Sequence, residues 1–347
     1  MKKITISSLA ISYVGFFLGA GFVSGQELWQ FFACFGIWGF LGFLLSAGLF
    51  FLVDYSALRL AQRLGTADVG VLILPKGSPF FRGCISFLQC LLLFCVLVIM
   101  IAGASALLSG ATGLSPALCG ALFVLVVLPV AMMELKGLVA AFSVMVPITA
   151  VIAVLLGLVV LAQQDFQLAP AVGSSSALVP NWWVSGITYA AYNLFGSIGV
   201  LVPFAALVQD RRTIRGGLGL GTGILLLLTF SMLSAMVASP ACGTSELPIA
   251  ELAMQLHPVL GFVYQLLMGF GMFSTALAAI FALVTQVSFH VSAAQIHKRL
   301  VLPPLLLLAY VLSLLGFSGL IGVVYPIFGY IGIPFLILLV IHALRKQ

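Results

Sequence analysis

Residues 15–27 read Gly-Phe-Phe-Leu-Gly-Ala-Gly-Phe-Val-Ser-Gly-Gln-Glu and lie within the first long apolar segment, 5–33. Four glycines fall within eleven residues, and each weakens a helix by up to about 1 kcal/mol relative to alanine. A break in lipid leaves backbone groups unpaired unless they line a polar cavity. Because the run ends in Ser24, Gln26 and Glu27, it predicts a helix unwound at a binding site. The alternative is close packing, since glycine lets membrane helices approach each other.

The composition of the 347 residues excludes a water-soluble protein. Apolar side chains make up 63% of the chain and charged ones 6%, against about 45–50% and about 25% in soluble domains. With lipid as the solvent, the backbone must pair its polar groups internally, and apolar runs of about 20 residues favour helices over barrel strands. The predicted fold class is an all-α polytopic membrane protein with about ten transmembrane helices. They are predicted at 5–33, 37–58, 83–108, 116–133, 138–162, 182–208, 216–238, 258–290, 301–316 and 320–342.

The charged residues predict the orientation of the spans. When the chain is threaded with its N-terminus inside, all 14 Lys and Arg residues fall on one side, and Asp165, Glu246 and Glu251 fall on the other. Because basic loops stay in the cytoplasm, we expect a multi-pass protein of the plasma (inner) membrane with both termini cytoplasmic. The net charge of +6 is then loop charge, and no nucleic-acid partner is expected. A signal peptide cleaved near Ala20 is the alternative for the first segment, but residues 26–53 continue apolar.

A second cluster of polar residues and glycines lies in the sixth span. Residues 192–197 read Tyr-Asn-Leu-Phe-Gly-Ser, about half the chain length after the first cluster. Paired interruptions in two halves are typical of the midplane site of a secondary transporter. We therefore predict that spans one and six are both broken, and that two five-span halves form an inverted repeat. The halves are 1–163 and 182–347, joined by an outer loop at 164–181.

The two predicted breaks define a candidate substrate site. Amide groups freed between Ala20 and Ser24 would hold an anionic group such as a carboxylate. Carbonyl groups freed between Asn193 and Ser197 would accept hydrogen bonds from an amine. Glu27 is interpreted as a cavity residue, a proton or cation site, or a gate, because an isolated charge in a membrane segment is costly. The candidate substrate-binding residues are Gly19, Ala20, Gly21, Phe22, Ser24, Gln26, Glu27, Tyr192, Asn193, Phe195, Gly196 and Ser197.

Three further features of the sequence have interpretations that are less directly tied to the substrate. Tyr192 and Phe195 could form an aromatic wall for the solute or pack in the core. Asp54, near the cytoplasmic end of span two, is expected to pair with Arg59 at the membrane interface. The polar segment 239–257 could form a short helical lid over the outer mouth.

The segment Gly19-Ala-Gly-Phe-Val-Ser-Gly-Gln-Glu27 resembles the signature of the YkvI-like membrane proteins, within the amino acid–polyamine–organocation superfamily. The likeness extends over the whole chain in span count and charge layout. It implies the LeuT-type fold, with ten core helices in an inverted repeat and with spans one and six broken around the substrate.

The resemblance also implies a sodium site. In sodium-coupled members the ion is bound by groups on spans one and eight. The matching positions here are Gly15, Leu18, Gly271, Ser274 and Thr275. The two hydroxyl groups could instead bond their own helix backbone. Some proton-coupled members place a lysine on span five, and residues 138–162 have none, which favours sodium. No other cofactor is expected.

The resulting functional hypothesis is sodium-coupled symport of a small amino-acid-like or other polar organic solute, zwitterionic in charge, by alternating access. The partners are the lipid bilayer and that solute, and proton-coupled or uncoupled transport stays open as an alternative. An ion channel fits less well because the sequence has no charged ring or repeated carbonyl filter. An enzyme is not expected, because HExxH, GxSxG and paired-aspartate patterns do not occur within the spans.

Overall fold

The computed structural model describes the chain as a bundle of helices, and the described residues contain no strand. The described residues are 5–18, 20–132, 147–148, 150–159, 162, 172–173, 178–208, 210–239, 243, 245, 247–288 and 298–345.

Six of the described helices are long and apolar enough to cross a membrane. They are α4 (Ile37–Leu64), α6 (Pro79–Thr112), α9 (Trp182–Leu201), α10 (Arg211–Ala238), α12 (Pro258–Ser288) and α14 (Phe317–Arg345). Shorter apolar helices add α1 (Ile6–Phe17), α7 (Pro116–Ala131), a helix at Ala150–Val159, and α13 (Lys298–Ser313). Each of these elements overlaps one of the ten predicted spans, and several extend beyond its predicted ends. The prediction of an all-α polytopic membrane protein is therefore confirmed.

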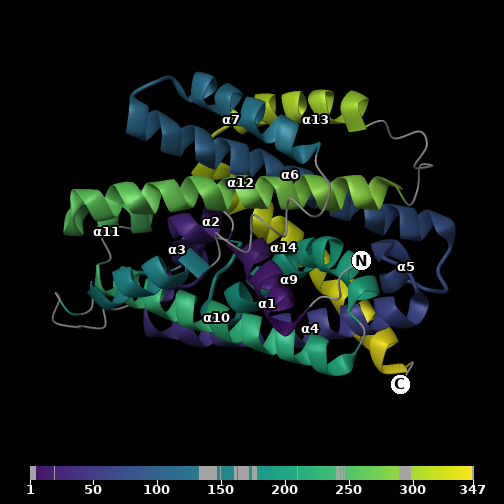
Figure 1. The fold of residues 1–347 in the computed structure, drawn as a ribbon. Coiled ribbons are helices and arrows are strands. Elements are labelled where there is room, and N and C mark those ends of the chain that lie inside the picture. Colours follow the sequence, from purple (N-terminus) through teal and green to yellow (C-terminus); the bar gives the residue numbers. More distant parts are fainter. Residues whose placement is uncertain are drawn as a thin grey trace.

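The helices run side by side, with α6, α7, α12 and α13 in the upper part of Figure 1 and α4 and α10 in the lower part. Between these groups lie α1 and α9, the helices that open the two predicted halves. α1 packs against α10, and α9 packs against α4. Each opening helix thus contacts the second span of the other half, as two halves of similar structure would. The division at 164–181 itself stays a prediction.

Span one is interrupted where the glycine run predicts. α1 ends at its C-cap Leu18, and the chain continues as two short helices, α2 (Ala20–Ser24) and α3 (Gln26–Phe31). The turn between them is made by Gly25, whose φ of 84° lies in the left-handed region that favours glycine. Gly19 lies outside the described residues. The sequence therefore correctly located a break in a membrane-embedded segment.

Span six is not broken where the sequence predicts. α9 is a continuous helix through residues 192–197, and only at Val202–Leu207 does the chain tighten into the 3-10 helix η2. The polar side chains bond to the backbone of their own helix: Asn193 Nδ2 donates to a carbonyl oxygen four residues earlier at 3.1 Å, and Ser197 Oγ to one three residues earlier at 3.1 Å. Polar side chains inside a helix commonly make such bonds, and α9 stays continuous with them.

The glycines of α9 serve close packing instead. A Cβ at Gly196 would lie 3.1 Å from the Phe16 ring, and one at Gly199 would lie 2.8 Å from Gln89 Nε2. The same Gln89 amide donates to the carbonyl oxygen of Phe195 at 3.0 Å, which ties α6 to α9. Glycine thus lets these helices pack closely. Close packing was the alternative interpretation given above for the glycines of span one.

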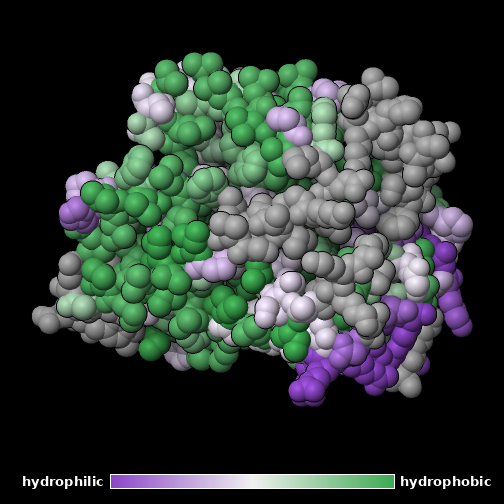
Figure 2. Space-filling view, viewed as in Figure 1, coloured by the Kyte–Doolittle hydropathy of each residue, from purple (hydrophilic) through white to green (hydrophobic). Residues whose placement is uncertain are grey.

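Hydrophilic side chains gather at the end of the bundle where the chain terminates. In Figure 2 they form a purple region at the lower right, while most of the remaining coloured surface is apolar. Exposed arginines lie at the start of α10, the end of α4 and the end of α14. They are Arg211, Arg212, Arg215, Arg63 and Arg345. Their clustering agrees with the basic loops inferred from sequence, and the assignment of this end to the cytoplasm stays a prediction.

A candidate solute and ion site at the break in span one

A small buried cavity lies beside the break in span one. Its volume is about 30 Å³, which admits a few water molecules but no amino-acid-sized solute. Six helices contribute to its wall. The lining residues are Phe16 and Phe17 of α1, Glu27 of α3, Leu92, Val96 and Met100 of α6, Tyr192, Asn193 and Gly196 of α9, Thr275 of α12, and Tyr325 of α14. A solute could therefore enter only if these helices move apart.

Glu27 places a carboxylate in the middle of the bundle. Its side chain is 5% exposed, and Oε2 accepts a hydrogen bond from the Tyr192 hydroxyl at 2.6 Å. The turn at Gly25 brings the carboxylate back over Gly21, where any Cβ would overlap it. Among the described residues, no lysine, arginine or histidine forms an ion pair with it. A buried carboxylate with neutral neighbours is costly, so the arrangement indicates function rather than stability.

Two tyrosines fix the geometry around this carboxylate. The rings of Tyr192 and Tyr325 are stacked, with centroids 4.3 Å apart and an interplanar angle of 10°. Tyr192 also contacts Phe31 with ring centroids 5.9 Å apart, and Tyr189 edge-on at 5.4 Å. Because the ring of Tyr192 packs against these three rings, its hydroxyl is directed at Glu27 by packing as well as by the hydrogen bond.

Span eight lies against the end of α1 at the predicted ion-binding positions. A Cβ built at Gly271 would lie 3.1 Å from the carbonyl oxygen of Leu18, so the two backbones are close. Gly15 is buried one turn earlier on α1. Ser274 Oγ donates to the Gly271 carbonyl oxygen at 3.0 Å, as a membrane hydroxyl commonly does. Thr275 Oγ1 is buried and has no hydrogen-bond partner. Hydroxyl and carbonyl oxygens are the donors that hard cations prefer.

The structure separates the predicted substrate residues into two groups. Those that line the cavity are Glu27, Tyr192, Asn193 and Gly196. Phe195 does not: it is fully buried and stacks on Phe335 with ring centroids 5.7 Å apart. The interpretation of Phe195 as a packing residue is the one that this geometry supports. Ser197 also does not line the cavity, and its hydroxyl donates a hydrogen bond to Asp54.

The remaining predicted substrate residues belong to span one and build the break itself. Ser24 Oγ donates to the carbonyl oxygen of Gly21 at 3.1 Å and accepts from the Gln26 amide at 3.2 Å. Phe22 is buried in the core. Gln26 Oε1 is buried without a hydrogen-bond partner. The side chain of Ala20 lies outside the described residues, as does all of Gly19.

Asp54 does not form the interfacial pair with Arg59 that the sequence suggests. α4 continues to Leu64, so Asp54 lies about 15 Å from the end of its helix at 1.5 Å per residue. Its side chain is 1% exposed, and Oδ1 accepts a hydrogen bond from Ser197 at 3.0 Å. Arg59 donates instead to Gln62 Oε1 at 2.9 Å. The expectation was wrong because the predicted span ended too early.

Several cavity residues had no signal in the sequence. Tyr325, Phe16 and Phe17 are apolar or aromatic residues within long apolar runs, and the three residues from α6 carry no polar group at all. Only the neighbouring Pro326 marks the position of Tyr325 in span ten. Which apolar side chains face a cavity depends on helix packing, which composition does not reveal.

The predicted lid segment contains a short helix, α11 (Pro248–Leu256). Ile249 at its start reaches the turn at Gly25, where a Cβ would lie 2.6 Å from Ile249 Cγ1. The helix therefore packs directly over the break in span one. Its action as a lid stays a prediction.

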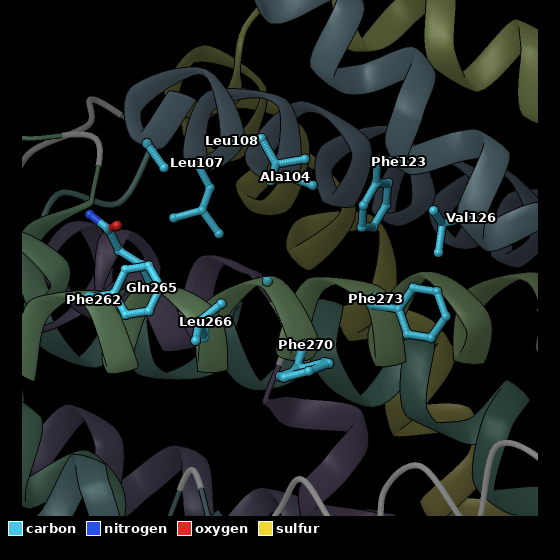
Figure 3. Close-up of a pocket in the computed structure, with 12 residues that line it drawn as sticks. Ala104, Leu107, Leu108, Phe123, Val126, Phe262, Gln265, Leu266, Phe270 and Phe273 are labelled. Atoms are coloured by element: carbon cyan, nitrogen blue, oxygen red, sulfur yellow. The ribbon is translucent and has the colours of Figure 1, made fainter. Parts of the chain in front are cut away.

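A larger groove of about 330 Å³ lies between α12 and the helices α6 and α7 (Figure 3). Its lining is apolar apart from Gln265, and Phe262, Phe270 and Val126 are each more than half exposed, at 59%, 51% and 59%. A groove of this kind on a membrane protein faces lipid chains. Gln265 is its single polar lining residue and no charged group lines it, so the cavity that contains Glu27 is the better candidate for a polar solute.

The fold is that of known solved structures. A complex of MhsT with L-phenylalanine matches 90% of this chain and 80% of its own at a TM-score of 0.65 and 16% identity. A Na+-coupled sialic acid symporter matches 96% and 78% at a TM-score of 0.71 and 13% identity. A manganese transporter of Eremococcus coleocola matches 96% and 78% at a TM-score of 0.62 and 15% identity. The chain has the LeuT-type fold.

At the level of sequence, the chain is similar to the uncharacterized membrane protein YkvI of Bacillus subtilis (strain 168). The two are 25% identical over 338 residues, which is 96% of this chain and 95% of YkvI. No family model matches the chain. The resemblance that was first recognised in residues 19–27 therefore extends along nearly the whole sequence.

Proposed function

We propose that this protein is a secondary active transporter, and not an enzyme, that couples the uptake of a small polar organic solute to sodium by alternating access. The observation that carries the proposal is the break in span one beside a buried cavity that contains Glu27 and Thr275. Irregular backbone at membrane depth is tolerated where it is buried in protein or lines a cavity. In transporters such a break is where ions and solutes bind.

The ion part of the proposal rests on the contact between α1 and α12. The carbonyl of Leu18 ends a helix, and the last carbonyls of a helix have no partner within it. It faces Gly271, one turn of α12 before the unpartnered hydroxyl of Thr275. Gly15, Leu18, Gly271, Ser274 and Thr275 thus form a set of oxygen donors of the type that sodium takes.

Two other mechanisms remain as alternatives to this proposal. Glu27 and Asp54 are both buried carboxylates within the bundle, so a proton could be the coupling ion in place of sodium. An ion channel is less favoured, because the described residues that line the cavity of about 30 Å³ form neither a charged ring nor a repeated carbonyl filter.

Uptake into proteoliposomes tests the proposal. An inward sodium gradient should drive the accumulation of a radiolabelled amino acid or amine from a panel of candidate solutes. A choline gradient of equal size should not. Uptake driven by a proton gradient in the absence of sodium would identify the proton, and not sodium, as the coupling ion. Conductance steps in planar bilayers would instead identify a channel.

A further inference from the structure

Within the proposed transport function, the geometry at the break in span one points to the chemical class of the solute. We propose that the solute is a small organic amine without a carboxylate, and that its ammonium group binds Glu27. The proposal rests on the proposed function, narrows its small polar organic solute to one class, and departs from the zwitterionic solute expected from sequence. Three features of the cavity support it.

The first feature is the missing counter-charge of Glu27. Its polar neighbours are neutral tyrosines: Tyr192 donates a hydrogen bond at 2.6 Å, and the Tyr189 hydroxyl also interacts with the carboxylate. No lysine or arginine lines the cavity. A carboxylate held inside a protein needs a cation or several hydrogen-bond donors to offset its lost hydration. The ammonium of a solute would supply that charge.

The second feature is the position of the carboxylate. It lies against Gly21, within the segment whose freed amides were expected to receive the carboxylate of a solute. The next two amides along the chain have acceptors: Gly25 N donates to Phe22 O at 3.0 Å, and Gln26 N to Ser24 Oγ at 3.2 Å. A solute carboxylate bound in the segment at Gly21 would lie beside the like charge of Glu27, which disfavours binding.

The third feature is the aromatic wall. The stacked pair Tyr192 and Tyr325 and the rings of Phe16 and Phe17 line the same cavity as the Glu27 carboxylate. Aromatic faces attract organic cations electrostatically, and the attraction is stronger where water is excluded. A cavity with one carboxylate and several aromatic rings thus suits a solute with an ammonium group on an apolar body.

The test uses matched ligands that differ only in charge. Pentylamine, pentanoate and norvaline share a five-carbon chain, and phenethylamine, phenylpropanoate and phenylalanine share a phenyl group. Each is added near neutral pH to the purified full-length protein, and the thermal unfolding midpoint is measured. We expect the amines to raise the midpoint, because a ligand that binds the folded state stabilises it, and the carboxylates and amino acids to leave it unchanged.

The variant Glu27→Gln should weaken amine binding by at least about tenfold, which corresponds to about 1.4 kcal/mol. Glu251→Gln is the matched control, because Glu251 is an exposed residue of α11 and the same chemical change there should have no effect. Should Glu27→Gln not fold, Glu27→Asp is the second variant. It keeps the charge but moves the carboxylate back by one methylene group, so it should weaken amine binding by a smaller factor.

The inference is wrong if neither amine stabilises the wild-type protein, if an amino acid binds as well as its amine, or if Glu27→Gln binds amines unchanged. Sodium-driven uptake of norvaline that survives Glu27→Gln would leave the transporter proposal standing and overturn the amine. Glu27-dependent amine binding without any sodium-driven uptake would support the amine and overturn the sodium-coupled transporter. The two proposals can therefore fail separately.

Discussion

Asp54 on α4 accepts a hydrogen bond from Ser197 on α9 at 3.0 Å, while its second oxygen, Oδ2, is buried with no partner. Tyr13 of α1 lies near enough to interact electrostatically with the carboxylate, and its hydroxyl lies 3.5 Å from Thr222 Oγ1 of α10. The acid therefore joins helices from both predicted halves. A buried acid with a single hydroxyl donor is not retained for stability, since apolar or neutral groups do better there.

The first prediction concerns this acid. Asp54→Asn preserves the size of the side chain and removes the charge. We therefore expect the free energy of unfolding to rise by about 1 kcal/mol, which raises Tm by about 2–4 °C. Solute uptake should fall by about tenfold or more if the acid takes part in transport. Differential scanning fluorimetry and proteoliposome uptake measure the two effects. A lower Tm with normal uptake would show that Asp54 is a structural residue.

The second prediction concerns the ion. Thr275→Val removes a buried hydroxyl that has no partner, so in sodium-free buffer the variant should be more stable by about 1–3 kcal/mol. Added sodium should stabilise the wild-type protein but not the variant, because an oxygen donor is lost. The readout is Tm as a function of sodium concentration at constant ionic strength.

Thr229 provides a matched control for that experiment. Its Oγ1 is also buried without a partner, but it lies on α10 and does not line the cavity. Thr229→Val should therefore show the same gain in sodium-free buffer and keep the full response to sodium. An equal response to sodium in both variants would remove Thr275 from the ion site.

The third prediction concerns Gly21. Gly21→Ala adds a Cβ that would overlap the Glu27 carboxylate, so Glu27 must move and solute binding should weaken by about tenfold or more. Gly48→Ala is the control: Gly48 lies within α4, where a Cβ meets nothing within 4 Å. There alanine should stabilise the helix by up to about 1 kcal/mol and leave binding unchanged. Unchanged binding in Gly21→Ala would place the solute elsewhere.

The fourth prediction concerns topology and needs no solute. Fusing alkaline phosphatase after residue 346 should give no enzyme activity, because the predicted C-terminus is cytoplasmic. Insertion next to Glu251 of α11 should give activity, because that segment is predicted to be outside. The reverse pattern would invert the membrane orientation and with it the direction of the proposed uptake.

The sequence by itself determined the membrane class, the spans and the place of the first break. These follow from quantities that are local in the chain: the length of apolar runs and a glycine run that weakens one helix. The break at Leu18 and the turn at Gly25 appear where that run predicts them.

Only the tertiary structure decided which similar-looking residues differ in role. Gly21 and Gly196 both occur in glycine-containing clusters, yet one lies at a break and the other packs within a continuous helix against Phe16. Asp54 resembled an interfacial acid and is instead buried. Burial and hydrogen bonding depend on which helix lies opposite, and residues that are far apart in sequence supply that neighbour.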